Sequence, residues 1–377
     1  MVTNSPLKDS TISLNPMESK EPQELHKKRT AKVRDWLSDS DGLLVTFDSV
    51  VIEWLSGFTG SNGCIFLDND DFILFTDSRY KLQAPEEIKQ FGVDARCVIT
   101  ADPYSEISEI SKSRVIYLDG ERISWAQKKK LSEKLQGEIT DTQSPIRELR
   151  SIKDPHEVQA IATAANIADR ALTQTLETIE MPITEKQFAA IIDHKLQLLG
   201  ASGPAYPTIV AAGSNSAFPH ATPTDSVINE NAMILVDVGA QYNGYRSDMT
   251  RMIPTGSLTQ EQNEMIELVL EAQKVAISEV RPGILGKEID HACRTYLKEN
   301  GFGENFTHGT GHGVGLEIHE YPRINSKSED LIEEGMVITI EPGIYLDGKY
   351  GIRWEDLLLV TSDGVEFLTK SEKLTQL

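Results

Sequence analysis

The sequence has 377 residues, of which 39% are hydrophobic and 25% are charged, so we expect a folded protein of two domains. Its formal net charge of -21 at pH 7 opposes binding to nucleic acid and to anionic membranes, and no run of about 18 apolar residues predicts a membrane span. Three cysteines without CxxC spacing, and a start without the apolar core of a signal peptide, indicate a cytoplasmic protein.

The N-terminal part of the chain alternates helical and strand patterns. Residues 1–24 are polar and rich in Ser, Pro and Lys, which predicts a loose tail. Residues 25–145 interleave apolar runs with helical periodicity, which predicts an α/β domain. We expect helices at 27–37, 80–91 and 125–135, and strands at 43–47, 64–67, 72–75 and 115–118.

The polar stretch TDTQSP marks a domain boundary near residue 145. Residues 146–377 then alternate long helical patterns with β-rich segments, which predicts an α+β domain. We expect helices at 155–180, 184–199, 259–280 and 286–300, and strands at 208–212, 233–238, 247–253, 336–340 and 352–360. The candidate metal ligands and histidines considered below all lie in this second domain.

Two aspartates flank a predicted hairpin in ILVDVGAQYNGYRSDMTR, residues 234–251. If Asn243 and Gly244 form the loop, Asp237 faces Thr250 and Asp248 is its diagonal neighbour on the same face. If the loop shifts by one residue, the two aspartates face each other. Both registers bring the carboxylates to one side, where a cation would offset their repulsion. Solvated aspartates are the alternative, but apolar neighbours place Asp237 inside the fold.

The segment THGTGHGVGLEIHE places His308, His312 and His319 within twelve residues. Its glycines disfavour a helix, and they would let the backbone pass close to a ligand or an ion. Such a cluster indicates a functional site.

Two glutamates follow on predicted strands. Glu341 ends the strand in MVITIEPGIY, and Glu355 lies within GIRWEDLLLV, residues 351–360, where it shares a face with Arg353. A glutamate among apolar residues needs a partner, which is either a metal ion or the neighbouring Arg353.

Four carboxylates and one imidazole make an oxygen-rich ligand set that balances the charge of two divalent ions. Such a set suits manganese or cobalt better than the N/S sites typical of structural zinc, so manganese is the first choice of metal, with cobalt and zinc as the others. His220, His308 and His319 would then be free for proton transfer or substrate binding.

The order of these ligands resembles the metal site of the pita-bread metallopeptidases. The matching residues are Asp237, Asp248, His312 in HGTGHG, Glu341 in IEPG and Glu355 in RWED. His220 in SNSAFPH, with His308 and His319, is similar to the histidine set of Xaa-Pro aminopeptidases and Xaa-Pro dipeptidases. WLSGFTGSNG and FTDSRYKLQA resemble the N-terminal domain of Xaa-Pro aminopeptidases.

The resemblance implies a creatinase-type α/β domain followed by an α+β pita-bread catalytic domain, in a homodimer. It implies an Xaa-Pro aminopeptidase with two metal ions, acting on peptides with proline at the second position. Glu341 would handle the proton of the attacking water, and His220 and His319 would stabilise the oxyanion or hold the substrate. His308 would shape the proline pocket, and Arg353 and Arg79 would contact the substrate.

Three other functions remain open at this stage. An Xaa-Pro dipeptidase would use the same residues on a shorter substrate. A creatinase-type amidinohydrolase works without metals and need not keep these carboxylates. A catalytically silent binding module of the same fold usually loses metal ligands.

Overall fold

The computed structural model describes residues 21–38, 42–135, 137–141 and 145–373. Its internal contacts divide the chain into two units, Met1–Ser144 and Pro145–Leu377. Most of the predicted N-terminal tail lies outside the described residues. Helix α1 nevertheless begins at Glu21, so the prediction of a loose tail as far as residue 24 is wrong by four residues. No helix among the described residues is both long and apolar enough to cross a membrane.

The N-terminal unit is built on a mixed six-stranded sheet with the order β4-β3-β2-β1-β5-β6. β2 runs antiparallel to both β1 and β3, while the pairs β3–β4, β1–β5 and β5–β6 are parallel. The helices and strands in chain order are α1 (Glu21–Leu37), β1 (Leu43–Thr46), α2 (Ser49–Ser56), β2 (Gly63–Leu67), β3 (Phe72–Thr76), α3 (Gln83–Gln90), β4 (Arg96–Ile99), α4 (Pro103–Ser111), β5 (Ile116–Leu118), α5 (Trp125–Lys134) and β6 (Ile139–Asp141).

The central strands of this sheet are apolar runs because both of their faces are covered. Every residue of β1 and β3 is buried, which matches the continuous hydrophobic pattern rather than an alternating one. Helix α2 was not predicted, because its short apolar sequence SVVIEWLS is equally compatible with a strand. Its ends are specified locally: Asp48 accepts hydrogen bonds from the backbone of Val50 and Val51, and Gly57 ends it with φ 72°.

The C-terminal unit contains the long helices close to their predicted bounds. Three of them begin at capping boxes, in which a cap side chain and the side chain three residues later each accept a backbone N–H. The boxes are Asp154 with Glu157, Thr184 with Gln187, and Thr259 with Gln262. The helices are α6 (Ile146–Ser151), α7 (Pro155–Thr178), α8 (Glu185–Leu198), α9 (Gln260–Glu279) and α10 (Gly286–Glu299).

The strands of this unit form small sheets between two pairs of helices. They are β7 (Gly203–Pro204), β8 (Ile209–Ala212), β9 (Met233–Asp237), β10 (Ala240–Tyr242), β11 (Tyr245–Arg246), β12 (Thr250–Pro254), β13 (Gly311–Gly313), β14 (Glu320–Ile324), β15 (Val337–Ile340), β16 (Gly343–Leu346), β17 (Tyr350–Arg353), β18 (Asp356–Thr361) and β19 (Gly364–Phe367). The sheet orders are β11-β10-β7, β12-β9-β8, β14-β13-β15-β18-β19 and β16-β17.

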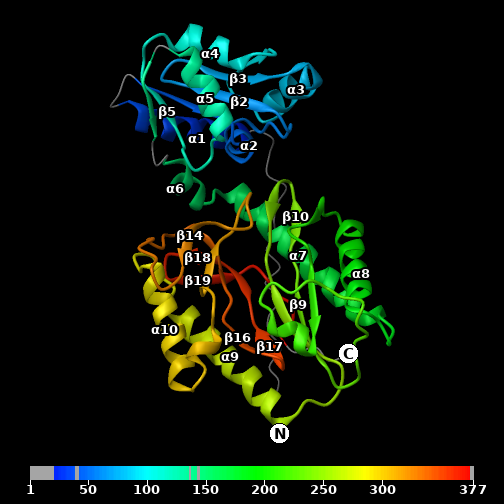
Figure 1. Cartoon of the computed structure of the whole chain (residues 1–377). Coiled ribbons are helices and arrows are strands. Elements are labelled where there is room, and N and C mark those ends of the chain that lie inside the picture. The colour runs from blue at the N-terminus through cyan, green and yellow to red at the C-terminus, as the bar shows by residue number, and fades with distance from the viewer. Residues whose placement is uncertain (1–20, 39–41, 136, 142–144, 374–377) are drawn as a thin grey trace. The chain divides into compact units, whose positions relative to one another are not determined.

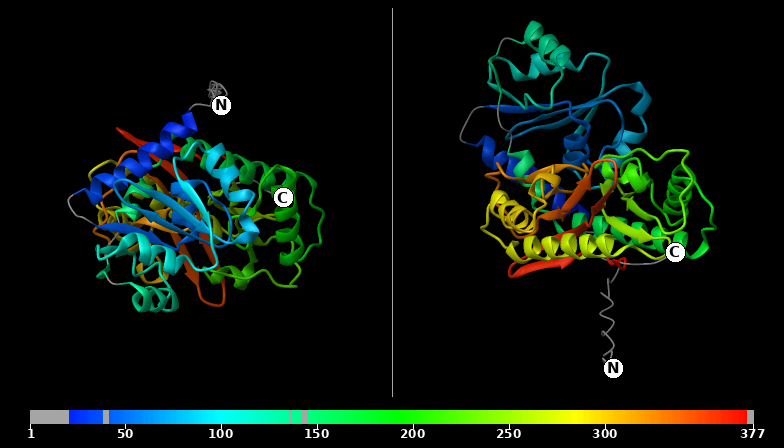
Figure 2. Two further views of the ribbon diagram at one scale, coloured as in Figure 1. Left: turned by 90° about the horizontal axis from the view of Figure 1, so that it is seen from above. Right: turned by 60° about the horizontal axis from the view of Figure 1, so that its bottom comes forward.

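Two large hydrophobic cores, and a smaller cluster that joins α7 to β15, β18 and Leu368, hold the described part of the unit together. Helices α7 and α8 pack on β8, β9 and β12, whereas α9 and α10 pack mainly on the strands from β13 onward. The green pair and the yellow pair of helices therefore lie on different sides of the strands (Figure 1), and the right-hand view of Figure 2 shows the same separation. The strand ends between the two pairs carry the candidate site.

Candidate metal centre

Asp237 and Asp248 are brought together by the predicted hairpin. Asn243 and Gly244 both have positive φ, 48° and 82°, and Tyr242 pairs with Tyr245 across them. Asp237, at the end of β9, lies opposite Thr250, which confirms the register with Asn243 and Gly244 as the loop. Asp248 lies two residues before Thr250, and both aspartates are buried.

The buried Tyr206 hydroxyl joins the two aspartates. It lies 2.5 Å from Oδ1 of Asp237 and within hydrogen-bond distance of Oδ1 of Asp248. Burial, together with the charges of both aspartates, raises the pKa of Tyr206 well above its usual value, so the phenol stays protonated and can donate. The two carboxylates are thus oriented from one side by a single side chain.

His312 lies on β13 and turns one ring nitrogen toward the carboxylates. Its Nδ1 is 3.1 Å from the carbonyl oxygen of Gly313, to which it donates. Its Nε2 lies 3.6 Å from Oδ2 of Asp248 and 3.3 Å from Oε1 of Glu341. A backbone carbonyl on one ring nitrogen is the usual arrangement that leaves the other nitrogen for a metal ion.

The glycines around His312 serve the packing of strands. A Cβ on Gly311 would lie 2.0 Å from the carbonyl oxygen of Thr339 on β15, and one on Gly313 would lie 2.2 Å from that of Tyr321 on β14. Only glycine lets β13 fit between these two strands. At these two positions the expectation that glycine admits a ligand is wrong, because the close neighbours are backbone atoms of the protein itself.

Glu341 and Glu355 project from the ends of strands. Glu341 directly follows β15, as the sequence predicted. Glu355 lies between β17 and β18, which belong to different sheets, so the prediction of one continuous strand over 351–360 is wrong. The chain turns at Trp354 and Glu355 because β17 pairs with β16 while β18 pairs with β15. The buried carboxylate of Glu355 accepts a hydrogen bond of 2.7 Å from Thr250 Oγ1.

Arg353 supports the site and does not pair with Glu355. Its guanidinium is buried and donates to Asp237 Oδ2 at 2.6 Å, to Thr250 Oγ1 at 3.0 Å and to the Tyr345 hydroxyl at 2.8 Å. The alternative of an internal Arg353–Glu355 ion pair is therefore wrong. The contacts with protein groups engage all three guanidinium nitrogens of Arg353. Direct contact between Arg353 and substrate stays a prediction.

The donor set fits divalent metal ions. One ligand atom from each of Asp248, His312 and Glu355 lies within 4.8 Å of the others. Burial, with the charge of Asp237, raises the pKa of Asp248 well above its usual value, and burial with the charge of Asp248 does the same for Glu355. Such shifts mean that concentrated negative charge is costly here, and a dication removes that cost.

The pKa values of His312 and Glu341 are shifted by the charge of each other. Burial lowers the pKa of His312, but the hydrogen bond and charge of Glu341 raise it above its usual value overall. Burial would raise the pKa of Glu341, yet the hydrogen bond from His312 and the neighbouring cations lower it to about 2. Surroundings that favour a proton on His312 also favour a metal cation among the carboxylates.

The remaining histidines surround this cluster. The His319 ring lies 4.4 Å from the His312 ring, centroid to centroid, in an edge-to-face arrangement. His308 Nε2 accepts from the Tyr345 hydroxyl at 2.9 Å, and its Nδ1 donates to its neighbour's carbonyl oxygen at 2.8 Å. His220 is exposed and follows Pro219, whose carbonyl oxygen accepts from Arg353 at 3.1 Å. Their catalytic roles stay predictions.

Arg79 belongs to the N-terminal unit. Its exposed guanidinium pairs with Asp77 at 2.7 Å, a contact that the sequence did not predict. Substrate contact by Arg79 stays a prediction.

Sequence reasoning missed three side chains of the site. Tyr206 and Tyr345 bond its charged groups; Tyr206 stands far from the motifs in sequence, whereas Tyr345 ends the motif MVITIEPGIY, four residues after Glu341. Arg323, on β14, pairs across the strands with His312 and is exposed. Only its position four residues after His319 could have drawn attention to it.

Comparison with known proteins agrees with this arrangement. Residues 159–362 match Metallopeptidase family M24, and residues 29–152 match the Creatinase/Prolidase N-terminal domain. The chain belongs to metallopeptidase family M24. The predicted fold class is confirmed, namely a creatinase-type α/β domain followed by an α+β pita-bread catalytic domain.

Several M24 relatives cover most of the chain. The Xaa-Pro dipeptidase of Pyrococcus furiosus is 39% identical over 313 residues, which are 82% of this chain and 88% of that protein. The structure is also similar to a Xaa-Pro dipeptidase from Bacillus anthracis, with a TM-score of 0.88, 31% identity, and coverage of 93% of this chain and 100% of the other. An X-Pro aminopeptidase from Thermotoga maritima gives a TM-score of 0.84 at 32% identity, with the same coverage.

Proposed function

We propose that this chain is an Xaa-Pro dipeptidase, which hydrolyses the bond before a C-terminal proline in a dipeptide. The observation that carries the proposal is the convergence of Asp248, His312 and Glu355, with Glu341 3.3 Å from His312, in a member of family M24. The relative from Pyrococcus furiosus bears the name Xaa-Pro dipeptidase. This similarity favours dipeptidase activity over the aminopeptidase activity expected from the sequence alone.

The proposed cofactor is a pair of divalent ions, with manganese as the first choice and cobalt or zinc as the others. Asp237, Asp248, His312, Glu341 and Glu355 would hold them. Four carboxylates provide the hard oxygen ligands that manganese prefers. When bound, such ions polarise the substrate carbonyl and lower the pKa of the attacking water.

The side chains around the ions would divide the remaining work. Glu341 would accept the proton of the attacking water and pass it toward the proline nitrogen. His220 and His319 would hold the substrate or stabilise the oxyanion. His308, fixed by Tyr345, would shape the pocket for the proline ring. Proline needs a dedicated pocket since its nitrogen has no N–H with which to bind an ordinary protease.

Arg323 supports the choice of a dipeptide. Residues paired across antiparallel strands project from the same face, so the exposed guanidinium of Arg323 is on the side of His312. An Xaa-Pro dipeptide presents a free carboxylate on its proline, and a guanidinium binds a carboxylate with two hydrogen bonds. A longer peptide has an amide in place of this carboxylate, so its binding is strengthened less by Arg323.

The test compares kcat/KM for Ala-Pro and Ala-Pro-Ala, with manganese and after treatment with EDTA. We expect manganese-dependent cleavage of Ala-Pro, with a higher kcat/KM than for any cleavage of Ala-Pro-Ala. Glu355→Gln, which removes the charge of one proposed ligand at nearly constant volume, should abolish turnover. Cleavage that persists without metal would refute the proposed chemistry, and preference for Ala-Pro-Ala would establish an aminopeptidase instead.

The aminopeptidase is the second candidate, because a structure named X-Pro aminopeptidase matches the chain at a TM-score of 0.84. A homodimer in the cytoplasm is proposed for either enzyme. The measured mass in solution tests whether the protein is a homodimer, and cell fractionation tests whether it is cytoplasmic.

A further inference from the structure

The C-terminal segment, Thr369–Lys373, is connected by hydrogen bonds to both strand ends that carry the proposed glutamate ligands, directly at Asp356 and through Gln273 at Ile340. Lys373 is the centre of these contacts. Its ammonium group lies 2.7 Å from Asp356 Oδ2 and donates to Gln273 Oε1 at 2.5 Å. Asp356 directly follows Glu355 in the chain, and Gln273 comes from the middle of α9. A single side chain near the C-terminus thus bonds two buried polar groups.

The first connection leads to Glu355. Asp356 is 1% exposed and accepts from Arg251 Nη2 at 2.9 Å and from Thr369 Oγ1 at 3.1 Å. Arg251, also 1% exposed, donates to the carbonyl oxygen of Glu355 at 2.6 Å. The Glu355–Asp356 peptide is therefore held at its carbonyl oxygen by Arg251, and through the Asp356 carboxylate by Arg251 and Lys373.

The second connection leads to Glu341. The amide nitrogen of Gln273 donates to the carbonyl oxygen of Ile340, the residue before Glu341, at 2.9 Å. The same nitrogen lies 3.2 Å from Asp356 Oδ2. Since Lys373 donates to the amide oxygen, it fixes which way this fully buried amide faces. Without that contact, only the two acceptors of the amide nitrogen, the Ile340 carbonyl oxygen and Asp356 Oδ2, hold the amide in place.

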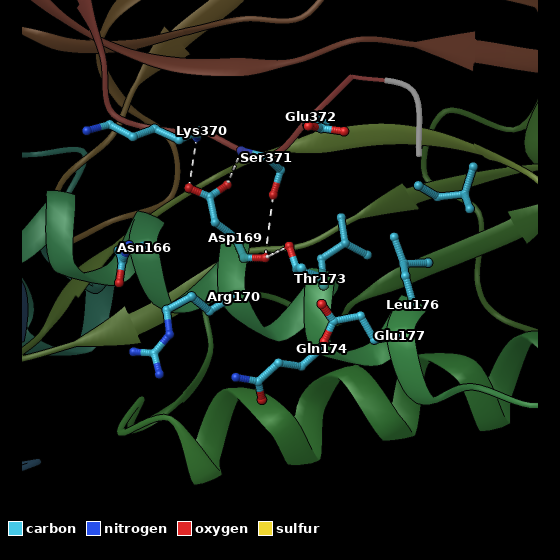
Figure 3. A pocket seen from close by; sticks show the side chains of 12 residues that line it. Asn166, Asp169, Arg170, Thr173, Gln174, Leu176, Glu177, Lys370, Ser371 and Glu372 are labelled. Carbon is cyan, nitrogen blue, oxygen red and sulfur yellow. Dashed lines mark hydrogen bonds between the residues drawn. The ribbon is translucent and has the colours of Figure 1, made fainter. Parts of the chain in front are cut away.

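The segment itself is fixed from the opposite side. The buried carboxylate of Asp169, on α7, accepts from the backbone N–H groups of Lys370 at 2.8 Å and Ser371 at 2.9 Å, and it points at them in Figure 3. Arg251 Nε donates to the Ser371 carbonyl oxygen at 3.2 Å. An open cavity of about 790 Å³ lies beside this part of the segment, so polar contacts are important in holding Lys370 and Ser371 there.

We propose that Lys373 is a positioning residue for the metal centre, and that the C-terminal segment sets the affinity of Glu341 and Glu355 for metal ions. The inference rests on the metal site of the proposed function. Lys373 bonds neither proposed ligand itself. It acts through Asp356 on the backbone of Glu355 and through Gln273 on the backbone of Glu341. Groups hydrogen-bonded directly to metal ligands typically change metal affinity 10–100-fold when removed, so for Lys373, which acts one step further out, we expect an effect at the lower end of that range.

The experiment measures Mn²⁺ binding to the full-length, EDTA-treated protein by titration calorimetry, together with the Tm without metal. We expect Lys373→Met to weaken the Mn²⁺ Kd about tenfold. Lys370→Met removes the same charge from an exposed neighbour in the segment and should leave Kd unchanged. Lys373→Arg should restore most of the affinity. Should Lys373→Met fail to fold, Lys373→Gln keeps a hydrogen-bond donor and should still weaken Kd severalfold.

The outcomes separate this inference from the proposed function. An unchanged Kd in Lys373→Met, whether or not its metal-free Tm falls, would overturn the positioning role and leave the dipeptidase proposal intact. An equal loss of affinity in Lys370→Met would also overturn it, because net charge alone would then explain the effect. A wild-type protein that binds no Mn²⁺ would overturn the metal site on which both rest.

Discussion

Removing Arg353 should expose how strongly the carboxylates of the site repel one another. The substitution Arg353→Met keeps the length of the apolar stem but removes the buried guanidinium. Asp237 then loses its partner at 2.6 Å, and Thr250 and Tyr345 lose a donor each. Breaking a buried ion pair from one side costs about 3–5 kcal/mol, because the remaining charge stays buried and unpaired.

The shift in melting temperature follows from the size of the unit. For a unit of roughly 230 residues, 1 kcal/mol changes Tm by about 2–4 °C, so the metal-free variant should melt roughly 6–20 °C below the wild type. Divalent ions bound to the same carboxylates would replace much of the lost positive charge. The Tm difference should therefore shrink to about half or less in saturating Mn²⁺.

Differential scanning calorimetry with EDTA and with Mn²⁺ measures both differences. Arg281→Met is the matched control, because Arg281 pairs with Glu279 at the surface, where such a pair contributes at most about 1 kcal/mol. A metal-free Tm shift no larger than that of the control would refute the view that Arg353 offsets carboxylate repulsion. A shift of equal size with and without Mn²⁺ would refute the link to the metal site.

Three further predictions concern the same site. First, the raised pKa values of Asp248 and Glu355 mean that both carboxyls still carry protons in the folded, metal-free protein at a pH above about 4. In the unfolded chain the same carboxyls have already lost their protons at that pH. The stability of the metal-free protein therefore falls as the pH rises. Mn²⁺ displaces those protons, and the Tm gain on adding it should increase from about pH 5 to 7.5; a constant gain would contradict this. Second, Gly311→Ala should lower both Tm and Mn²⁺ affinity because its Cβ meets the Thr339 carbonyl oxygen, whereas Gly203→Ala, with open space around it, should change neither. Third, Arg323→Met should raise KM for Ala-Pro about tenfold or more, as expected for a lost hydrogen bond to a charged group; an equal effect of the exposed Lys327→Met would count against a specific role.

The starts of the long helices, and the hairpin that carries Asp237 and Asp248, follow closely from local sequence. Capping boxes at Asp154, Thr184 and Thr259 specify where α7, α8 and α9 begin, whatever surrounds them. The dipeptide Asn243-Gly244 favours positive φ at both positions, and that turn sets Asp237 opposite Thr250. These features depend on residues a few positions apart, so the sequence alone was enough to predict them.

The remaining site geometry depends on strands that meet only in the folded chain. The break between β17 and β18 arises because their pairing partners are different strands, and no local signal in GIRWEDLLLV records those partners. Arg353 likewise pairs with Asp237, over a hundred residues away, instead of the nearby Glu355. The sequence by itself determined which residue types are the candidate ligands and their order along the chain. Tertiary packing decided which charges neighbour each other, because distant strand pairing, not spacing along the chain, sets the distances between them.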